Sequence, residues 1–369
     1  MSSHIRRIAI CTGGGDAPGL NAVIRAVVIA AANRSWECYG ICEGFNGILF
    51  PERYPDGGVY RLTRDKVSGI GHLGGTILGT TNKGNPLHFP MKMPDGTTRD
   101  LDRTDEIVEY FVKKELDALV SIGGDGSLTI ANALHLKGLR VVSVPKTIDN
   151  DLDKTFTTFG FDSAVSFATE CLDRLHSTAE SHHRVMVVEV MGRYAGWIAL
   201  HAGIAGGAHA ILIPEIPFDL DKVAAKILDR DREGHMYSLV VAAEGAELAH
   251  GQHAILEPAV IGHAERLGGI GEHIKKVLEE RTGKDARVVV LGHLLRGGSP
   301  TSFDRLAAMR FGTAAVRALA EDRSGVMVAL AFPNVNYVAL EDVAGRMKGV
   351  PLDCDTLQTG RDLGICFGD

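Results

Sequence analysis

The chain has 369 residues, of which 45% are hydrophobic and 23% charged, and its formal net charge is −7. This is the composition of an ordinary soluble globular protein, long enough for two domains that each have a core. The sequence shows no basic domain or stripe of the kind that binds nucleic acid, and no apolar run near the ~18 residues of a membrane helix, so we expect neither partner.

The chain opens with a predicted strand at residues 7–12, a glycine-rich loop at 13–19 and a helix at 21–33. This order suits phosphate binding, because free N–H groups and the helix dipole face the anion. The loop is not a Walker loop, since the chain contains no GxxxxGK[ST]. A GxGxxG match at residues 69–74 follows no clear strand, and we interpret it as chance.

A second unit of the same kind follows, with a strand at 118–122, the loop GGDGS at 123–127 and a helix at 128–136. Before it we expect a strand at 37–41, a loop rich in Gly, Thr and Asn at 73–86, a polar surface loop at 90–102, and an amphipathic helix at 104–116. Asp125 would lie at a glycine-lined strand end, where a carboxylate can hold Mg²⁺. Taken alone, GGDGS fits a tight turn with a capping Asp equally well.

The segment VVSVPKTIDNDLD, residues 141–153, places a short β-branched run before a polar loop. The run ends at Pro145, and Lys146, Thr147, Asp149 and Asp151 follow within six positions. In open α/β sheets the ligand crevice lies outside the carboxyl ends of the strands. A solvated Asp/Asn turn is the alternative interpretation. The similar clusters after other apolar runs favour a binding site.

Helices and strands alternate through the rest of the chain. We predict helices at 161–179, 196–205, 219–232, 258–281 and 303–320, and strands at 184–190, 210–213, 237–243, 287–291 and 326–331. The strands are apolar without alternation in polarity, which is typical of parallel sheets covered on both faces. The sequence therefore predicts an α/β fold.

The cysteines and the N-terminus bear on the compartment. Six cysteines are present, none in a CxxC motif or at paired zinc-ligand spacing: Cys11, Cys38, Cys42, Cys171, Cys354 and Cys366. In a chain of this size they indicate reduced thiols, and so a cytoplasmic protein. The N-terminal sequence is too short and too polar for a signal peptide.

Five motifs taken together are far more specific than any one of them. TGGGDAPGLNAVIR, GGDGS, PKTIDND, MGRYAGW and GHLLRGGSP, in this order, resemble the 6-phosphofructokinase family (type A) from about Ile8 to about Arg310. The resemblance implies two similar three-layer lobes with mainly parallel sheets and an active site in the cleft between them. Residues 1–160 plus 295–345 would form the phosphoryl-donor lobe, and residues 161–294 plus 346–369 the sugar-phosphate lobe.

The resemblance also implies the reaction, which is phosphoryl transfer from MgATP to the 1-hydroxyl of D-fructose 6-phosphate. Asp149 corresponds to the base of the family, and Thr147 can hydrogen-bond the transferring phosphoryl group. Asp151 is expected to position substrate and metal, Asp125 to bind Mg²⁺, and Arg193 to complete the catalytic set. Such a reaction needs a base, a metal for the leaving phosphates, and cations for the transition state.

The donor-binding residues follow from the same motifs. Gly14, Gly124, Gly126 and Ser127 match the nucleotide-phosphate contacts of the family. Asn82 and Lys83 stand where ATP-specific relatives carry an Arg–Phe pair near the nucleotide, so the sequence departs from the pattern at these two positions. Both are retained as donor-site candidates.

The sugar-phosphate contacts implied by the resemblance include most of the local cations. Arg suits a phosphate because its planar fork bonds two oxygens at once. By resemblance His293 and Arg296 bind the 6-phosphate, while Arg184 and Arg287 reach the site of a neighbouring subunit, which implies a homodimer or homotetramer. The other substrate candidates are Lys146, Thr147, Ile148, Asp149, Met191, Gly192, Arg193, Glu244, Leu294 and Leu295.

Two positions bear on the donor and give opposite indications. Gly126 matches ATP users, because an Asp there would place charge and bulk where the α-phosphate of a nucleotide must lie. Lys146 and the loop at 90–102 resemble the mixed-substrate subgroup, which includes pyrophosphate users. We predict ATP, because exclusion by a clash is harder to relax than an added cation.

Two other functions are considered. GGDGS alone also fits a kinase that acts on NAD or a lipid, but such kinases lack the PKTIDND, MGR and HxxR clusters. A non-catalytic sugar-phosphate sensor would be expected to lose the base or the metal carboxylate, and both Asp149 and Asp125 are present. The allosteric site of the bacterial ATP enzymes is poorly matched: Arg25 and Arg64 are present, but His176 and His209 replace an Arg and a Glu of the family.

Overall fold

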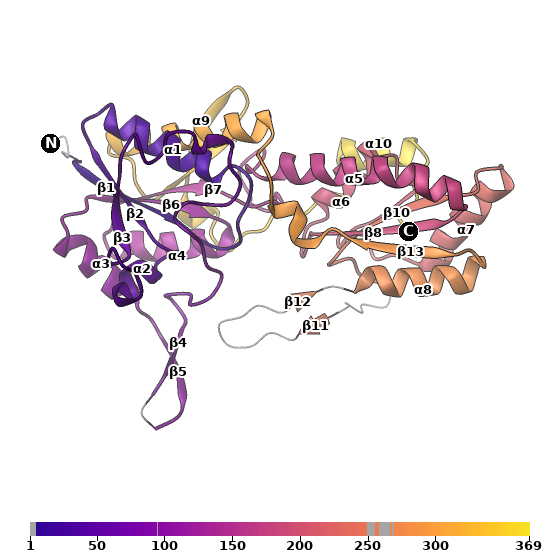
Figure 1. The fold of residues 1–369 in the computed structure, drawn as a ribbon, viewed down its shortest axis with the longest axis horizontal. Coiled ribbons are helices and arrows are strands. Elements are labelled where there is room, and N and C mark those ends of the chain that lie inside the picture. Colours follow the sequence, from indigo (N-terminus) through magenta and orange to yellow (C-terminus); the bar gives the residue numbers. More distant parts are fainter. Residues whose placement is uncertain (1–4, 94, 249–254, 258–265, 268) are drawn as a thin grey trace.

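The computed structural model describes residues 5–93, 95–248, 255–257, 266–267 and 269–369. The α/β class with mainly parallel sheets is confirmed, and the strands form two separate larger sheets that lie side by side in Figure 1. Among the described residues, no helix is both long and apolar enough to cross a membrane.

The first sheet has seven strands in the order β15-β14-β7-β6-β1-β2-β3. Its five central strands are parallel: β1 (Arg7–Thr12), β2 (Glu37–Ile41), β6 (Ala118–Gly123), β7 (Val141–Pro145) and β14 (Val326–Ala331). The two edge strands, which the sequence analysis did not predict, pair antiparallel: β3 (Val59–Leu62) and β15 (Asn334–Ala339).

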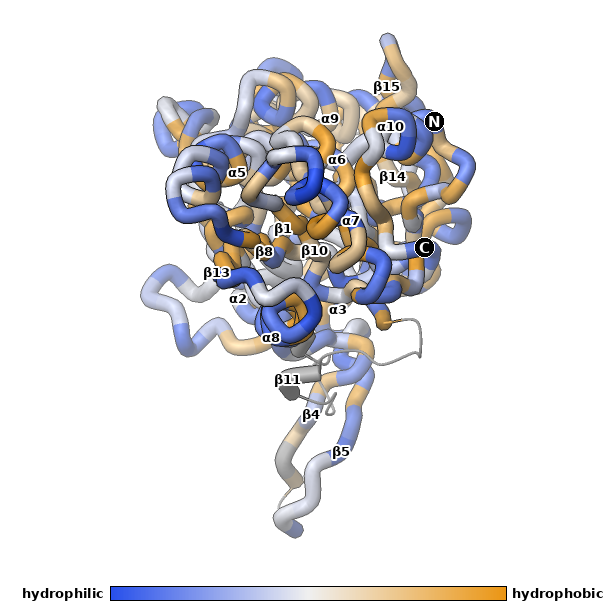
Figure 2. The backbone as a smooth tube through the Cα atoms, turned by 90° about the vertical axis from the view of Figure 1, so that its right-hand side faces the viewer, coloured by the Kyte–Doolittle hydropathy of each residue, from blue (hydrophilic) through white to orange (hydrophobic). Residues whose placement is uncertain are grey.

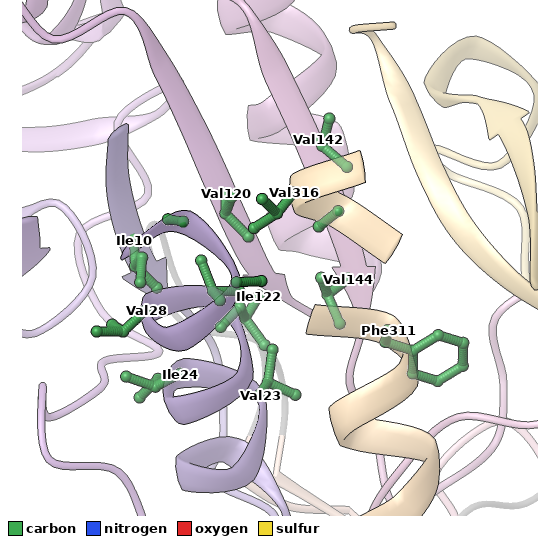
Figure 3. Packing of buried hydrophobic residues seen from close by; sticks show 14 of the residues in the cluster. Ile10, Val23, Ile24, Val28, Val120, Ile122, Val142, Val144, Phe311 and Val316 are labelled. Carbon is green, nitrogen blue, oxygen red and sulfur yellow. The ribbon is translucent and has the colours of Figure 1, made fainter. Parts of the chain in front are cut away.

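Helices cover both faces of this sheet. On one face lie α1 (Leu20–Ala32) and α9 (Ser302–Ala320), and their apolar side chains pack on strand residues such as Val120 and Val142 (Figure 3). The other face is covered by α2 (Asn46–Leu49), α3 (Thr104–Lys113) and α4 (Asp125–Leu136). Because both faces are covered, central strands such as β6 and β7 are buried along their whole length and largely apolar.

The second sheet has four parallel strands in the order β13-β8-β10-β9. They are β8 (Val185–Val190), β9 (Ala210–Leu212), β10 (Ser238–Ala243) and β13 (Ala286–Val290). One face packs against α5 (Phe161–His182), α6 (Trp197–Ala205) and α10 (Asp355–Asp362), and the other against α7 (Leu220–Arg232) and α8 (Ile270–Thr282).

The prediction of a surface loop at residues 90–102 is wrong. This segment forms a hairpin of β4 (Phe89–Lys92) and β5 (Thr98–Leu101). Asp95 Oδ1 accepts a hydrogen bond from Thr97 N at 2.9 Å, and Gly96 adopts a φ of 82° in the turn. An Asp-Gly pair between two extended runs is a strong hairpin signal. The hairpin extends away from the first sheet (Figures 1 and 2).

The helix predicted at 258–281 is only partly testable, because residues 258–265 and 268 lie outside the described residues. Within the described part, residues 266–267 form a strand, β12 (Arg266–Leu267), paired with β11 (Ile255–Glu257), and the helix α8 begins at Ile270. Within the described ranges, short 3₁₀ helices also occur at Pro51–Arg53, Ile70–His72, Gly292–Arg296 and Leu340–Asp342.

Candidate active site

A cavity of about 620 Å³ opens at the carboxyl edge of the seven-stranded sheet. The carboxyl ends of parallel strands meet at one edge, so the loops after β1, β6 and β7 converge there. The cavity brings together these predicted residues: Gly14, Asn82, Lys83, Gly124, Asp125, Gly126, Ser127, Lys146, Thr147, Ile148, Asp149, Asp151 and Arg296.

The glycine loops after β1 and β6 pack closely around the hydroxyl of Ser127. A Cβ atom on Gly13 would lie 2.6 Å from Ser127 Oγ, and a Cβ on Gly123 would lie 2.1 Å from the same atom. Gly14 N donates to Thr81 O at 3.0 Å, and Thr80 Oγ1 donates to Gly14 O at 2.6 Å. Only glycine permits this approach, which leaves backbone lining the cavity.

Asp125 is the first residue of α4, which begins three residues earlier than predicted. Its Oδ1 accepts a hydrogen bond from Gly345 N at 2.8 Å. A carboxylate in the first helical turn is favoured by the helix dipole. Asp125 also faces Asp151: burial raises the pKa of Asp151, and the charge of Asp125 adds to that rise.

The loop after β7 carries two half-buried aspartates, Asp149 and Asp151, each with one carboxylate oxygen shielded from solvent. Asp149 N donates to Thr147 Oγ1 at 3.1 Å, and Thr158 Oγ1 donates to Thr147 O at 2.7 Å, so the loop is tied back on itself. Burial raises the pKa of Asp149, and the charge of Asp151 adds to it. Among the described residues, Asp149 Oδ1 and Asp151 Oδ1 have no hydrogen-bond partner. Such oxygens can accept a hydroxyl or approach a cation.

Two cations face these carboxylates. Lys146 is 4% exposed and donates to Gly15 O; burial, followed by the charge of Arg296, lowers its pKa to about 8. The guanidinium of Arg296 lies directly over Gly15, where a Cβ would be 1.4 Å from Nη1. Arg296 Nε also contacts Met191 Sδ at 3.4 Å. Arg296 therefore links the cavity to the end of β8.

The predicted sugar-binding residues after β8 and β10 lie next to one another. Glu244 N donates to Val190 O at 2.8 Å, and Gly245 N donates to Gly192 O at 3.1 Å. Burial raises the pKa of Glu244, while the charges of Arg193 and Arg296 oppose the rise. The Arg193 guanidinium lies 5.6 Å from the centre of the Tyr194 ring. These residues do not line the cavity but adjoin it through Arg296.

The remaining predicted residues lie apart from the cavity within one chain. His293 and Leu294 are exposed, and Leu295 is buried in the second core. Arg184 and Arg287 lie at the amino ends of β8 and β13, where both contact Asp285, Arg184 Nε at 2.6 Å. Since a strand rises about 3.3 Å per residue, Arg184 is roughly 20 Å of strand from the carboxyl edge and Arg287 roughly 10 Å.

Some residues at the site were missed from the sequence. His88, just before β4, lines the cavity, and its Nδ1 lies 2.8 Å from Asp100 Oδ2 in β5, a strand that was predicted as part of a loop. Phe45 also lines the cavity. The contact of Gly345 with Asp125 joins residues too far apart in the sequence for any local pattern to indicate it.

A family model and individual relatives all relate the chain to enzymes that phosphorylate fructose 6-phosphate. The family model for phosphofructokinase matches residues 7–319. The chain is 49% identical to ATP-dependent 6-phosphofructokinase of Chloroflexus aurantiacus over all 369 residues, covering 99% of that protein. It is 46% identical over 350 residues to pyrophosphate–fructose 6-phosphate 1-phosphotransferase of Amycolatopsis mediterranei, covering 94% of this chain and 97% of that one.

Solved structures share the fold. Pichia pastoris phosphofructokinase in the T-state matches 97% of this chain with a TM-score of 0.77 and 31% identity, and the chain spans 36% of that longer protein. The pyrophosphate-dependent phosphofructokinase of Marinobacter aquaeolei matches 99% of this chain and 93% of its own, with a TM-score of 0.79 and 21% identity. At that identity the likeness shows the fold alone.

Proposed function

The chain belongs to the phosphofructokinase family, and from this premise we propose that it transfers the terminal phosphoryl group of MgATP to the 1-hydroxyl of D-fructose 6-phosphate. The products are fructose 1,6-bisphosphate and ADP, and the reaction is the glycolytic step of this family. The observation that carries the proposal is the carboxylate of Asp149, which has a buried, unpartnered oxygen in a cavity walled by two glycine loops.

Asp149 is the general base of the proposed reaction. Its unpartnered Oδ1 accepts the proton of the sugar hydroxyl as the oxygen attacks the phosphoryl group. Burial raises the pKa of this carboxyl, which brings its proton affinity closer to that of the reacting group. Thr147, whose hydroxyl already bonds Asp149 N, is placed to hydrogen-bond the transferring phosphoryl oxygens.

Backbone N–H groups and cations hold the donor phosphates in this proposal. The loop of Gly14, the N-terminus of α4 at Gly124–Ser127 and the ammonium of Lys146 surround the cavity. A helix N-terminus attracts anions through its free N–H groups and dipole. Asn82 and Lys83 line the outer part of the same cavity, where the nucleoside would lie.

The residues present fit a bound Mg²⁺. No three His, Cys, Asp or Glu side chains converge as a metal site in the described part of the chain. Mg²⁺ on a nucleotide needs only one or two carboxylates, with phosphates and water as the other ligands. Asp125, beside the unpartnered oxygen of Asp151, offers that set. When bound, the ion would neutralise charge on the leaving phosphates.

The sugar phosphate is proposed to bind between Arg296 and the ends of β8 and β10. Arg296 and Arg193 supply positive charge, and Glu244 accepts sugar hydroxyls. Met191, Gly192 and Ile148 shape the pocket around the ring, and His293, Leu294 and Leu295 precede Arg296 in the same short helix. Arg184 and Arg287 are proposed to reach the 6-phosphate of a neighbouring subunit, because within their own chain they lie at the opposite sheet edge.

ATP is the proposed donor, with pyrophosphate as the second candidate because of the relative in Amycolatopsis mediterranei. A Cβ on Gly126 would meet no atom within 4 Å, so this position leaves open space beside the phosphate loop. A nucleotide can use that space. Lys146 donates one hydrogen bond to Gly15 O of its own chain, and since an ammonium has three donors it can also contact a phosphate of either donor.

Assembly and location are proposed from the same evidence. A site completed by a neighbouring subunit requires a homodimer or homotetramer. The proposed location is the cytoplasm, the compartment in which fructose 6-phosphate and ATP are expected. The phosphoryl-donor lobe, 1–160 plus 295–345, and the sugar-phosphate lobe, 161–294 plus 346–369, keep the roles predicted for them.

The function is tested by identifying the product. Purified protein is incubated with MgATP and, in separate reactions, with fructose 6-phosphate, NAD or diacylglycerol, and the products are followed by ³¹P NMR. We expect a new phosphomonoester on carbon 1 of the sugar and no phosphorylated NAD or lipid. Phosphorylation of NAD or diacylglycerol in place of the sugar would contradict the proposal.

A further inference from the structure

A half-buried lysine outside the predicted site, Lys348, holds the turn that carries the proposed base. Lys348 Nζ donates to Asn150 Oδ1 at 3.2 Å, to Thr155 O at 3.0 Å and to Phe156 O at 3.3 Å. An ammonium has three donors and no acceptor. All three donors of Lys348 therefore form hydrogen bonds to the segment that follows β7.

The turn that Lys348 contacts has an unusual backbone. Asn150, between the two carboxylates, adopts a φ of 52°. This left-handed conformation is uncommon for a residue other than glycine, although Asn tolerates it better than most. Asn150 Oδ1 also accepts a hydrogen bond from Thr158 N at 3.1 Å, so its side chain is fixed from both sides. The direction of the chain at Asp149 and Asp151 depends on this turn.

The backbone around Lys348 contacts loops of the seven-stranded sheet and also the helix α6, which packs on the four-stranded sheet. Lys348 N donates to Asp151 O at 2.8 Å, and Lys348 O accepts from Trp197 Nε1 at 3.0 Å. Three residues earlier, Gly345 N donates to Asp125 Oδ1 at 2.8 Å. One short segment therefore contacts the loop of the base, the proposed metal carboxylate and the first residue of α6.

Lys348 is half-buried, and the partial burial of its ammonium needs an explanation beyond packing. Burying an ammonium is costly unless it is paired and hydrogen-bonded, and burial lowers the pKa of Lys348 to about 8. The charges of Asp151 and Asp153 act in the opposite direction. An apolar residue would avoid this cost, but it could not hold the two carbonyls and the Asn150 amide in place.

We propose that Lys348 is a positioning residue for phosphoryl transfer: it holds the turn at Asn150 and so fixes where the Asp149 carboxylate meets the sugar hydroxyl. The inference rests on the proposed function, because Asp149 must be the base for its position to matter. The segment that carries Lys348 lies beyond residues 7–319, where the family model matches.

The first test is Lys348→Met in the full-length protein, assayed with fructose 6-phosphate and MgATP. A small displacement of a reacting group can cost up to about a hundredfold in rate, so we expect kcat to fall by roughly 10- to 100-fold. KM for both substrates should stay close to wild type, because Lys348 does not line the cavity. Lys348→Arg, which retains the positive charge and several donors, should recover part of the lost kcat.

A matched control removes a lysine from the loop after β7, which Lys348 contacts. Lys154 is exposed and its ammonium lies 3.7 Å from Asp153, so Lys154→Met removes an equal charge without touching the turn at Asn150. We expect kcat close to wild type in this control. Melting temperature and oligomeric state are measured for every variant, so that a folding defect is separated from a rate defect.

A double-mutant cycle tests the route through Asn150. Asn150→Gly permits the left-handed turn without a side chain, and it removes the acceptor that Lys348 holds. If Lys348 acts through this turn, the kcat losses of Asn150→Gly and Lys348→Met will be strongly non-additive, which is the sign of coupled residues. The cycle also serves if Lys348→Met alone folds poorly, because Lys348→Arg can replace it.

The outcomes separate the inference from the proposed function. An inactive wild-type protein would overturn the function itself. An active wild type with Lys348→Met at wild-type kcat would overturn the role of Lys348 and leave the function standing. Fully additive losses, or a raised KM with unchanged kcat, would also overturn it.

Discussion

The two sheets of this protein present their polar residues in different ways. At the carboxyl edge of the seven-stranded sheet, glycine loops, the carboxylates of Asp149 and Asp151, and Lys146 already surround one cavity within a single chain. In the four-stranded sheet, Arg193 and Glu244 lie at the carboxyl edge, while Arg184 and Arg287 share Asp285 at the amino edge. The comparison shows that the donor residues gather within one chain, and it is the reason why we propose that the sugar half is completed by a second copy.

The largest effect is expected among the residues gathered within one chain, from Asp149→Ala. Loss of a general base typically costs about 10²- to 10⁴-fold in rate, and we expect kcat to fall by at least the lower figure with the fold intact. Circular dichroism and the coupled assay measure the two quantities. Asp153→Ala, an Asp of the same loop outside the cavity, is the control. Near-normal turnover of Asp149→Ala would remove this residue from the mechanism.

The second largest effect is expected at Gly126, in the half of the site that is proposed to bind the phosphoryl donor. Gly126→Asp places a carboxylate in the open space beside the phosphate loop, and repulsion should raise KM for ATP by about tenfold or more. The substitution lies in the first turn of α4, where an acidic residue is compatible with the helix. Gly126→Ala adds bulk without charge and should have a much smaller effect. Equal KM values for both variants would mean that charge at this position is irrelevant.

The third prediction tests whether the sugar-phosphate site depends on arginines of a neighbouring subunit. If it fails, the proposed difference between the two sheets is lost. In Arg184→Ala/Arg287→Ala, loss of charged hydrogen bonds should raise KM for fructose 6-phosphate by roughly tenfold or more, with little change in kcat. Arg232→Ala, which removes an exposed arginine of the same lobe, is the control.

Mixed assemblies make this third test sharper. Subunits with Asp149→Ala and subunits with Arg184→Ala/Arg287→Ala are dissociated, mixed and reassembled, then assayed at low fructose 6-phosphate. Shared sites predict more activity in the mixture than in either parent, since some sites combine an intact base with intact arginines. A mixture no more active than the mean of its parents argues for sites built within one chain.

The smallest effect concerns pH. A base must be ionised to act, so activity rises with pH through its pKa, and burial raises the pKa of Asp149 above the usual carboxyl range. The acid limb of kcat/KM should therefore lie above that range. In Asp151→Asn one like charge is removed, so the limb should move to lower pH, whatever the height of the profile. A limb that stays in place would mean that Asp151 does not influence the base.

Much of this organisation could be predicted from the sequence. Apolar runs closed by glycine or proline marked β1, β6 and β7, because a buried parallel strand must be apolar and its loop must turn at once. The hairpin of β4 and β5 was missed, although the Asp95-Gly96 turn indicated it, because both strands are only four residues long and β5 is polar. The link between Lys348 and Asn150 could not be seen, since it joins positions 198 residues apart.

The most direct test of the central claim compares two donors on the wild-type protein. Formation of fructose 1,6-bisphosphate is measured by a coupled assay with fructose 6-phosphate and equal Mg²⁺, using ATP in one series and pyrophosphate in the other. A donor cavity with open space at Gly126 predicts a larger kcat/KM for ATP. Faster turnover with pyrophosphate, or no bisphosphate with either donor, would contradict the account.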